Sequence, residues 1–442
     1  MSRQPYLSAV NERVIVFDGA FGTFVQDLDL GPDDFGGASL EGCNEYLCIT
    51  RPDVIRQMHS AFLDVGVDVL ETASFGSFST VLSEYNISDK AYELNVEAAR
   101  LARETANDYE ASGKARYVAG SIGPGTKLPS LGHIRFAELR DAYIEQARGL
   151  IVGGADLFLI ETCMDLLQIK AAMIACRRAM VAEGREIPIQ VQVTMETTGR
   201  MLVGSEIGAA LTAISAMKPD VFGINCATGP AEMQEHLRHL SQNASMPISV
   251  LPNAGLPSIV DGRTHYDLTP AELAKFHHHH VNDLGIGIVG GCCGTTPAHL
   301  KAVVDAVSGM AAPKRTPIVE PSVASIYSSV PMVQDKSFLI IGERTNTNGS
   351  KAFRDAMIAG EWDNCSKIAT EQIREGAHVL DVCVDYVGRD GAIDMDEIAS
   401  RFATQASVPL VLDSTEPQVL EAGLMHIGGR AILNSANLED GE

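Results

Sequence analysis

Short apolar runs rich in β-branched residues recur along roughly the first 300 residues, and most are separated by stretches with helical periodicity. In one such stretch Val54, Met58 and Phe62 recur at i, i+4 and i+8. In another, Thr269 and Glu272 have the spacing of a capping box, with proline at the first helical position. The pattern predicts eight strands, at residues 14–18, 67–72, 117–122, 157–162, 187–194, 221–226, 248–253 and 286–292.

Eight strand–helix units in roughly 300 residues predict an α/β fold, and specifically a (β/α)8 TIM barrel in which a ring of helices surrounds a parallel sheet. An open, doubly wound parallel sheet is the alternative architecture for the same alternation. We therefore predict that residues 1–310 form one barrel domain. An active site in such a barrel is expected at the carboxyl ends of its strands.

The pattern breaks over residues 311–336, where prolines stand at positions 313, 317, 321 and 331, as is typical of a linker. The strand–helix alternation then resumes in residues 337–442, with strands predicted at 338–343, 379–384, 409–414 and 432–435. Four units are half of what a parallel barrel contains. We therefore expect a partial second (β/α) barrel that has two open sheet edges and is less stable than the first.

The composition is that of a globular protein whose charge disfavours polyanionic partners. Hydrophobic residues make up 45%, and 34 basic against 57 acidic residues give a net charge of −23, which repels nucleic acid and anionic membranes. The first residues lack a signal-peptide pattern and no run of 18 apolar residues occurs, so a cytoplasmic location is expected. The nine cysteines, an odd number, are expected to be reduced thiols.

Three cysteines stand at predicted strand ends, where the loops of a barrel converge. Cys226 ends the sixth predicted strand, and Cys292 and Cys293 follow the eighth. Three thiolates suit Zn²⁺, which prefers soft sulfur and four ligands, and they leave one position open for a substrate. The glycine-rich loop at 290–294 could otherwise cradle a phosphate, but thiols add nothing to such a cradle. The other cysteines are expected to be small buried hydrophobes: Cys43, Cys48, Cys163, Cys176, Cys365 and Cys383.

Carboxylates also stand at these strand ends, notably Asp18 and Glu161. They are expected either to bind a ligand or to form salt bridges that close the barrel mouth. Four consecutive histidines at residues 277–280 lie between a predicted helix and the eighth strand. We expect them at the opposite, amino-terminal face as a solvated helix end, where adventitious metal binding is the alternative. Replacing them with polar residues should then leave activity intact.

Five segments in chain order resemble the motif series of the homocysteine S-methyltransferase family. They are residues 18–23 (DGAFGT), 120–124 (GSIGP), 161–162 (ET), 225–230 (NCATGP) and 290–296 (GGCCGTT). The resemblance spans roughly residues 10–308 and implies a zinc ion held by Cys226, Cys292 and Cys293. Through the zinc, these cysteines are the implied catalytic residues.

The same resemblance implies where homocysteine binds. Asp18 and Glu161 are implied to hold its amino group, with Ser121 in the same substrate site, while backbone amides receive its carboxylate. One loop departs from the family pattern: the family usually has Asn-Thr-Phe after the second strand, whereas this chain has Ala-Ser-Phe at residues 73–75. The contribution of this loop to substrate binding therefore does not follow from the resemblance.

Residues 338–435 resemble the first half of the methyltetrahydrofolate-binding domain of cobalamin-dependent methionine synthases, through the segments 341–346 (IGERTN) and 432–435 (ILNS). The resemblance implies that Asp381, Asp413 and Asn434 hold the pterin; otherwise they are ordinary turn-capping residues. Cys383 stands where the family typically has asparagine, which removes one amide. Because a partial barrel has only half of the loops that surround the pterin site, methyltetrahydrofolate binding is expected to be weak or absent.

Together the two resemblances imply an enzyme of methionine biosynthesis that transfers a methyl group to the thiolate of homocysteine. The implied donor is methylcobalamin recharged from 5-methyltetrahydrofolate, with cobalamin bound by a module outside these residues. Two alternatives stay open. One is a stand-alone methyltransferase that uses betaine or S-methylmethionine, and the other is a non-catalytic module that binds zinc or an amino acid.

Overall fold

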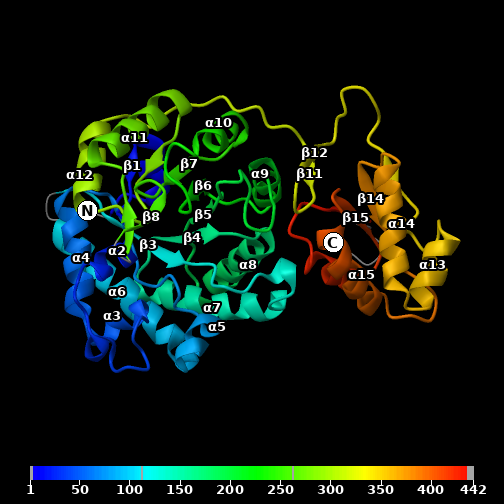
Figure 1. Ribbon diagram of the computed structural model, residues 1–442, viewed down its shortest axis with the longest axis horizontal. Coiled ribbons are helices and arrows are strands. Elements are labelled where there is room, and N and C mark those ends of the chain that lie inside the picture. Colours follow the sequence, from blue (N-terminus) through cyan, green and yellow to red (C-terminus); the bar gives the residue numbers. More distant parts are fainter. Residues whose placement is uncertain (1–2, 111–112, 261–262, 436–442) are drawn as a thin grey trace.

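The structure, a computed structural model, describes residues 3–110, 113–260 and 263–435. It contains a larger and a smaller unit with a small hairpin between them (Figure 1). An eight-stranded sheet forms the centre of the larger unit, and a four-stranded sheet forms the centre of the smaller one. Among the described residues, no helix combines the length and the apolar character needed to cross a membrane.

The eight strands of the larger unit are parallel and close into a barrel. A parallel bridge between Phe17 and Val69 joins the first strand to the second, and backbone hydrogen bonds from Asp68 N to Val16 O (2.7 Å) and from Asp18 N to Val69 O (3.0 Å) extend it. The TIM-barrel prediction is therefore confirmed and the open sheet is excluded. The strands, one in each predicted segment, are β1 (Ile15–Val16), β2 (Val69–Glu71), β3 (Tyr117–Ile122), β4 (Leu157–Cys163), β5 (Ile189–Val193), β6 (Val221–Asn225), β7 (Ile248–Leu251) and β10 (Ile288–Val289).

Helices that follow the strands surround the barrel (Figure 1). The predicted capping box is confirmed: the Thr269 hydroxyl accepts from Glu272 N, and the Glu272 carboxylate accepts from Thr269 N at 2.9 Å. The helices of this unit are α1 (Tyr6–Glu12), α2 (Phe21–Gln26), α3 (Leu47–Thr50), α4 (Pro52–Asp64), α5 (Ser79–Leu82), α6 (Ala91–Tyr109), α7 (Phe136–Gly153), α8 (Leu166–Glu183), α9 (Ile207–Ser215), α10 (Gln234–Asn243), α11 (Pro270–Leu284) and α12 (Pro297–Val307).

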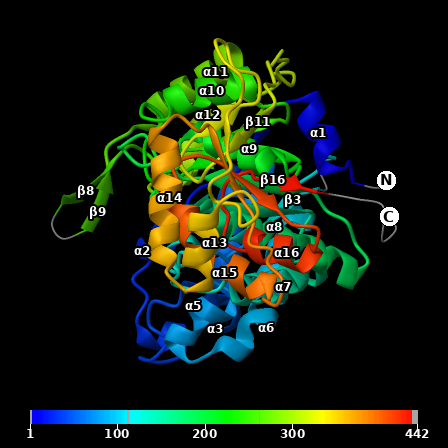
Figure 2. The ribbon, with the colours of Figure 1, turned by 90° about the vertical axis from the view of Figure 1, so that its right-hand side faces the viewer.

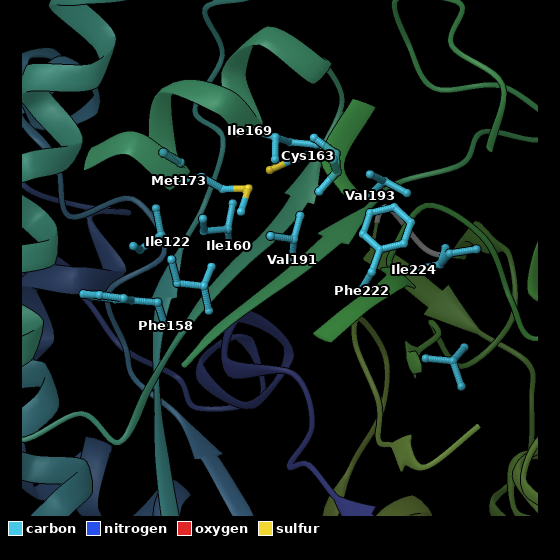
Figure 3. Packing of buried hydrophobic residues seen from close by; sticks show 14 of the residues in the cluster. Ile122, Phe158, Ile160, Cys163, Ile169, Met173, Val191, Val193, Phe222 and Ile224 are labelled. Atoms are coloured by element: carbon cyan, nitrogen blue, oxygen red, sulfur yellow. The ribbon is translucent and has the colours of Figure 1, made fainter. Parts of the chain in front are cut away.

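The alternation of side chains along the strands produces two apolar layers. The outer layer lies between the strands and the helices, and Figure 3 shows the part in which side chains of β4, β5 and β6 pack with Ile169 and Met173 of α8. The inner layer fills the barrel and includes Phe17. Helix α1 closes the barrel floor: Tyr6 contacts Tyr117 edge to face with ring centroids 5.4 Å apart and donates to Gln190 Oε1 at 2.8 Å. The carboxyl-terminal mouth is the end that α1 leaves open.

An antiparallel hairpin that the hydrophobic pattern did not predict follows β7. Its strands are β8 (Pro257–Val260) and β9 (Arg263–Tyr266). Figure 2 shows the hairpin projecting from the barrel. At its base, Leu268 N donates to Ala254 O at 2.9 Å, which holds the returning strand close to the end of β7. The hairpin therefore extends the rim of the barrel mouth.

The smaller unit is a half-barrel of four parallel strands. Its apolar core includes Phe353 and Phe402, which lie between the sheet and the helices. Within the described residues β13 and β16 each pair on one side, and the side chains of Ile341 and Leu433 are 44% and 49% exposed. The predicted partial barrel with two open edges is confirmed. Its elements are β13 (Ile341–Gly342), α13 (Lys351–Ile358), α14 (Trp362–Arg374), β14 (Val379–Val382), α15 (Gly391–Gln405), β15 (Leu410–Asp413), α16 (Pro417–Leu424) and β16 (Ile432–Asn434).

The segment predicted as a linker contains the hairpin β11 (Ser322–Ala324) and β12 (Ser329–Pro331), which contacts both units. Thr212 of the barrel and Ser329 share a hydrogen bond of 2.9 Å between their hydroxyls. On the other side, Tyr327 donates to Thr404 O at 2.6 Å, and Ala324 pairs with Arg430 as an antiparallel bridge. The domain boundaries at 310 and 337 stay a prediction, because this hairpin belongs to neither unit alone.

Lys170 of α8 makes a direct contact between the two units. Its ammonium donates to Ile427 O at 2.9 Å and to Gly429 O, two carbonyls that follow α16. Burial lowers the pKa of Lys170 to about 8, so the charged form is less favoured here than in water. The side chain nevertheless supplies the donors that these carbonyls need in a contact where little water can reach them.

The variant Lys170→Met should loosen the smaller unit. Two carbonyls would lose their donor, at a cost of about 1–3 kcal/mol for each buried group left without a partner. Limited proteolysis should then cut residues 337–435 faster than in the wild type, while the exposed Lys275→Met on α11 serves as the control. Equal digestion rates for the three proteins would contradict a stabilising role for Lys170.

Candidate functional site

Three thiols meet at the barrel mouth, as predicted. Cys226 follows β6, and Cys292 and Cys293 follow β10. Their sulfur atoms all lie within 4.8 Å of one another, with 3.8 Å between those of Cys226 and Cys293. Each of the three side chains is half-buried, so the cluster faces the open mouth of the barrel. The six other cysteines are buried away from it, as expected.

The end of β7 positions both thiol-bearing loops through its backbone. Leu251 O accepts from Cys226 N at 3.2 Å, and Pro252 O accepts from Cys292 N at 2.8 Å. Ala254 N in turn donates to Cys293 O at 2.9 Å. Cys226 itself adopts φ = +59°, a left-handed conformation that is uncommon for a residue with a side chain. Such backbone strain is concentrated at functional sites, where the surrounding structure compensates for it.

Two glycines allow the cysteine loop after β10 to approach its neighbours. A Cβ on Gly291 would lie 2.4 Å from Thr295 Oγ1, the same hydroxyl that donates to Cys292 O at 2.6 Å. Gly294 adopts φ = +78°, and a Cβ there would lie 2.3 Å from the ring of Tyr266 in the hairpin. The ring of Tyr266 therefore lies against the cysteine loop. A larger residue at position 291 or 294 would displace a thiol or the tyrosine.

The thiols influence each other strongly because they are close. Hydrogen bonds from the thiols of Cys226 and Cys292 lower the pKa of Cys293, whereas its neighbours raise the pKa of Cys292. The short distances therefore favour the thiolate form of Cys293 at the expense of its two neighbours. Soft, clustered donors of this kind fit Zn²⁺, and three of them leave a fourth tetrahedral position for an exogenous ligand.

Three carboxylates lie at the same mouth. Asp18 is 1% exposed and accepts from Glu71 N with both oxygens at 3.1 Å. Glu161 is 4% exposed and accepts from Ser121 Oγ at 2.6 Å and from Asn225 Nδ2 at 3.0 Å. Burial raises the pKa of Asp18 and Glu71 well above the usual range, and it raises the pKa of Glu161 to about 7. Mutual repulsion adds to the effect for Asp18 and Glu71.

No lysine, arginine or histidine forms an ion pair with Asp18, Glu71 or Glu161 within the described part of the chain. The salt-bridge alternative for these strand-end carboxylates is therefore wrong. One oxygen of Glu71 is buried and has no hydrogen-bond partner. Burying an ionised acid without a cation is costly, which is why the neutral forms of these acids are favoured and their pKa values are raised.

Comparison with known proteins assigns the chain to a family. A family model described as homocysteine S-methyltransferase matches residues 15–307, which include the three cysteines and the three carboxylates. The chain belongs to the homocysteine S-methyltransferase family. A second family model, described as pterin binding enzyme, matches residues 342–442.

Similar proteins include two methionine synthases. That of Mycobacterium tuberculosis is 53% identical over 436 residues and that of Mycobacterium leprae is 52% identical over 441 residues. Each match covers 99% of this chain but 36% of the relative, so the chain spans about a third of their length. A solved homocysteine methyltransferase from Escherichia coli, in its metallated form, has a TM-score of 0.53 and 21% identity, with coverage of 66% of this chain and 95% of that chain. At this identity the likeness shows a shared fold.

In this chain the loop at residues 73–75, which differs from the family pattern, supports the carboxylate site. Ser74 Oγ donates to Ser121 O at 2.8 Å, and Thr72 Oγ1 accepts from Ser121 N at 2.9 Å. Ser121 thereby holds Glu161 in place. Glu71 and Asn225 were not predicted as site residues, although Glu71 N donates to Asp18 and Asn225 directly precedes Cys226. Their positions at strand ends were the signal that could have found them.

The expectation for the histidines at 277–280 is wrong for two of them. His277 and His280 are fully buried, whereas His278 is exposed. His277 Nε2 lies 2.8 Å from Gly290 O, in the loop that carries Cys292 and Cys293. The cause is helical phase: positions 277 and 280 are three residues apart and share the face of α11 that packs on the barrel. They are therefore part of the protein interior rather than a solvated helix end.

In the smaller unit the residues predicted to hold a pterin share one hollow. A cavity of about 690 Å³ is lined by Asp381, Asp413 and Asn434 among others. Asn346, which the prediction did not include, donates to Asp381 at 2.7 Å and to Asp413 at 3.1 Å, while Asn434 donates to Asp413 at 2.7 Å. The hydrogen bonds tie the carboxylates together, so the turn-capping alternative does not describe them. Cys383 lies beside this group and is buried.

Glu161→Gln should change how the stability of the metal-free protein depends on pH. Folding raises the pKa of Glu161 from 4.5 to about 7, so the folded state binds this proton more tightly than the unfolded state. Its contribution to stability is present below pH 4.5 and is lost as the pH rises to 7, by about 3 kcal/mol. Calorimetric unfolding between pH 5 and 8 should show a smaller decline for the variant. The exposed Glu186→Gln is the control, and identical pH dependence in all three proteins would contradict the assignment.

Proposed function

We propose that the first barrel binds zinc through Cys226, Cys292 and Cys293 and transfers a methyl group to homocysteine, forming methionine. One observation carries the proposal: three clustered thiols face the same barrel mouth as three carboxylates that form no ion pair among the described residues. Homocysteine has a thiol for the first group and an ammonium for the second. Membership of the homocysteine S-methyltransferase family supports the same substrate.

The residues of the chain bind and orient the substrate. A zinc ion, when bound by the three cysteines, supplies the positive charge that keeps a substrate thiol in its reactive thiolate form at neutral pH. Asp18, Glu71 and Glu161 receive the substrate ammonium, which replaces the cation that these buried acids lack. Ser121 and Asn225 fix the orientation of Glu161, so the ammonium is held in one place while the sulfur attacks the methyl group. The new S–C bond forms as the bond between the methyl group and its donor breaks.

We further propose that the donor is methylcobalamin, recharged from 5-methyltetrahydrofolate. The match of residues 342–442 to the pterin-binding family and the similarity to two methionine synthases support this choice. Asp381, Asp413 and Asn434 would hold the pterin, with Asn346 between the two carboxylates. Because the relatives are much longer than this chain, cobalamin would be bound by a module outside the 442 residues or on a separate chain. We also propose that the chain divides into a first barrel, a linker and a pterin-binding unit, at residues 1–310, 311–336 and 337–442. The proposed location is the cytoplasm.

A methyl-transfer assay tests the proposed function. The purified chain, with its zinc quantified, is incubated with homocysteine and methylcobalamin, and methionine is measured. We expect turnover with one zinc per chain, and neither tight zinc binding nor methionine formation in Cys226→Ser. Cys176→Ala, a buried cysteine outside the cluster, should keep both. Turnover with betaine or S-methylmethionine alone would favour a stand-alone enzyme. No product with any donor would favour a non-catalytic module. Stoichiometric zinc together with activity in Cys226→Ser would refute the zinc site.

Glu161→Gln should raise KM for homocysteine and leave zinc in place. A charge-assisted hydrogen bond contributes roughly 1.5–3 kcal/mol, so KM should increase about tenfold to a hundredfold. Steady-state kinetics together with metal analysis of the same sample measure both effects. Loss of zinc from the variant would show instead that Glu161 shapes the thiol cluster rather than the substrate site.

A further inference from the structure

Helix α11 carries two buried histidines that the proposed chemistry does not use. His277 and His280 are both fully buried, and their rings meet edge to face with centroids 5.4 Å apart. The Nδ1 atom of each ring is buried without a hydrogen-bond partner. An apolar side chain would fill the same space without that cost. The hydrogen bonds of the two Nε2 atoms explain why these buried positions are occupied by histidines.

His277 contacts the loop that bears two of the thiols. Its Nε2 lies 2.8 Å from Gly290 O, and since a carbonyl can only accept, the ring donates. Gly290 precedes Cys292 by two residues and directly follows β10. Its neighbour Gly291 donates to Asp18 O at 3.2 Å. The imidazole therefore fixes the loop from outside the barrel at the point where the chain leaves the last strand.

His280 reaches the loop that bears the third thiol, through one intermediate side chain. Gln234 Nε2 lies 2.8 Å from His280 Nε2 and 3.0 Å from Pro230 O. An amide nitrogen has two hydrogens, so Gln234 donates one to the ring and one to the carbonyl. Pro230 ends the segment 226–230 that begins with Cys226. The same helix is thus linked to both thiol-bearing loops.

Both rings are neutral because they are buried, and His280 can accept at Nε2 only in its neutral form. Burial lowers the pKa of His277 to about 4, and burial also lowers the pKa of His280 well below its usual range. His277 is then the tautomer with hydrogen on Nε2. His280 is the tautomer whose Nε2 accepts, with its hydrogen on Nδ1. The two histidines use opposite tautomers for different tasks, one as a donor to a carbonyl and one as an acceptor from an amide.

We propose that His277 and His280 are positioning residues that tie the two thiol-bearing loops to helix α11, so that the three sulfurs are already clustered before a metal binds. This inference rests on the proposed zinc site, but it concerns the preparation of that site rather than the reaction. Hydrogen bonds that orient metal ligands from outside typically change metal affinity by about 10–100-fold. Here the bonds act on the backbone of the ligand loops, and the helix transmits rigidity from one loop to the other.

The test compares zinc affinity across variants of the full chain. His277→Leu and Gln234→Leu each remove one link, His277→Gln keeps an N–H donor near the position of Nε2, and the exposed His278→Leu is the matched control on the same helix. Zinc dissociation constants are measured by competition with a chromophoric chelator, and the absorption spectrum of the Co²⁺-substituted protein reports the ligand geometry. We expect about tenfold weaker zinc binding and an altered spectrum for the two leucine variants. His277→Gln should recover most of the loss, and His278→Leu should match the wild type.

A second measurement does not depend on zinc. In the metal-free protein, diamide takes up two hydrogens as two thiols join in a disulfide, and mass spectrometry follows the Cys226–Cys293 bridge, whose sulfurs lie 3.8 Å apart. Bridge formation should be several-fold slower in His277→Leu and Gln234→Leu. Folded leucine variants with wild-type zinc affinity and wild-type bridging rates would overturn the inference. If His277→Leu does not fold, Gln234→Leu and His277→Gln decide the matter by the same two readouts. Absence of zinc binding by the wild type would refute the proposed function, while the bridging rates would still decide the positioning role.

Discussion

The pairing of β1 with β2 closes the barrel, and the position of every group at the mouth depends on this closure. Phe17 and Val69 form the bridge, and the backbone of Asp18 is fixed by Val69 O directly beside it. In an open sheet of the same strand order, β1 and β2 would lie at opposite edges, far apart. Closure brings Glu71 at the end of β2 next to Asp18, whose carboxylate accepts from Glu71 N. On its other side β1 pairs with β10, so that Asp18 O accepts from Gly291 N in the loop that bears two of the thiols. The thiols on one side and the acids on the other therefore face a common space.

That space combines two electrostatic situations that are unfavourable in an empty protein. Three sulfurs lie close together, with the pKa of Cys293 lowered by its two neighbours, and three buried acids lack a cation within the described residues. Burying such groups without a counter-charge costs stability. In the proposed function a metal ion would relieve the first situation and a substrate ammonium would relieve the second. The large apolar layers around the barrel contribute stability that offsets this cost.

Much of this arrangement could be predicted from the sequence because the barrel strands are short apolar runs bounded by clear turn signals. The run at 117–122 coincides with β3, and Cys226 and the Cys292–Cys293 pair follow strands as the pattern required. The prediction was wrong about which face of α11 is buried. A run of four histidines contains no amphipathic pattern, so the sequence does not show which positions face the barrel, and the packing of α11 decides it. The hairpins β8–β9 and β11–β12 were not predicted because their strands are only three or four residues long and one strand of each hairpin contains a proline.

Helix α1 gives the barrel a closed floor, with Tyr6 anchored to Gln190 from below. The inner layer of apolar side chains leaves no passage along the barrel axis, because a TIM barrel is a packed core rather than a pore. A ligand can therefore reach the site only from the carboxyl-terminal mouth. In the proposed function an amino acid, a bulky methyl donor and the methylated product would share this entrance. They would have to bind and leave one after another, so the fold itself would limit the order of binding and release.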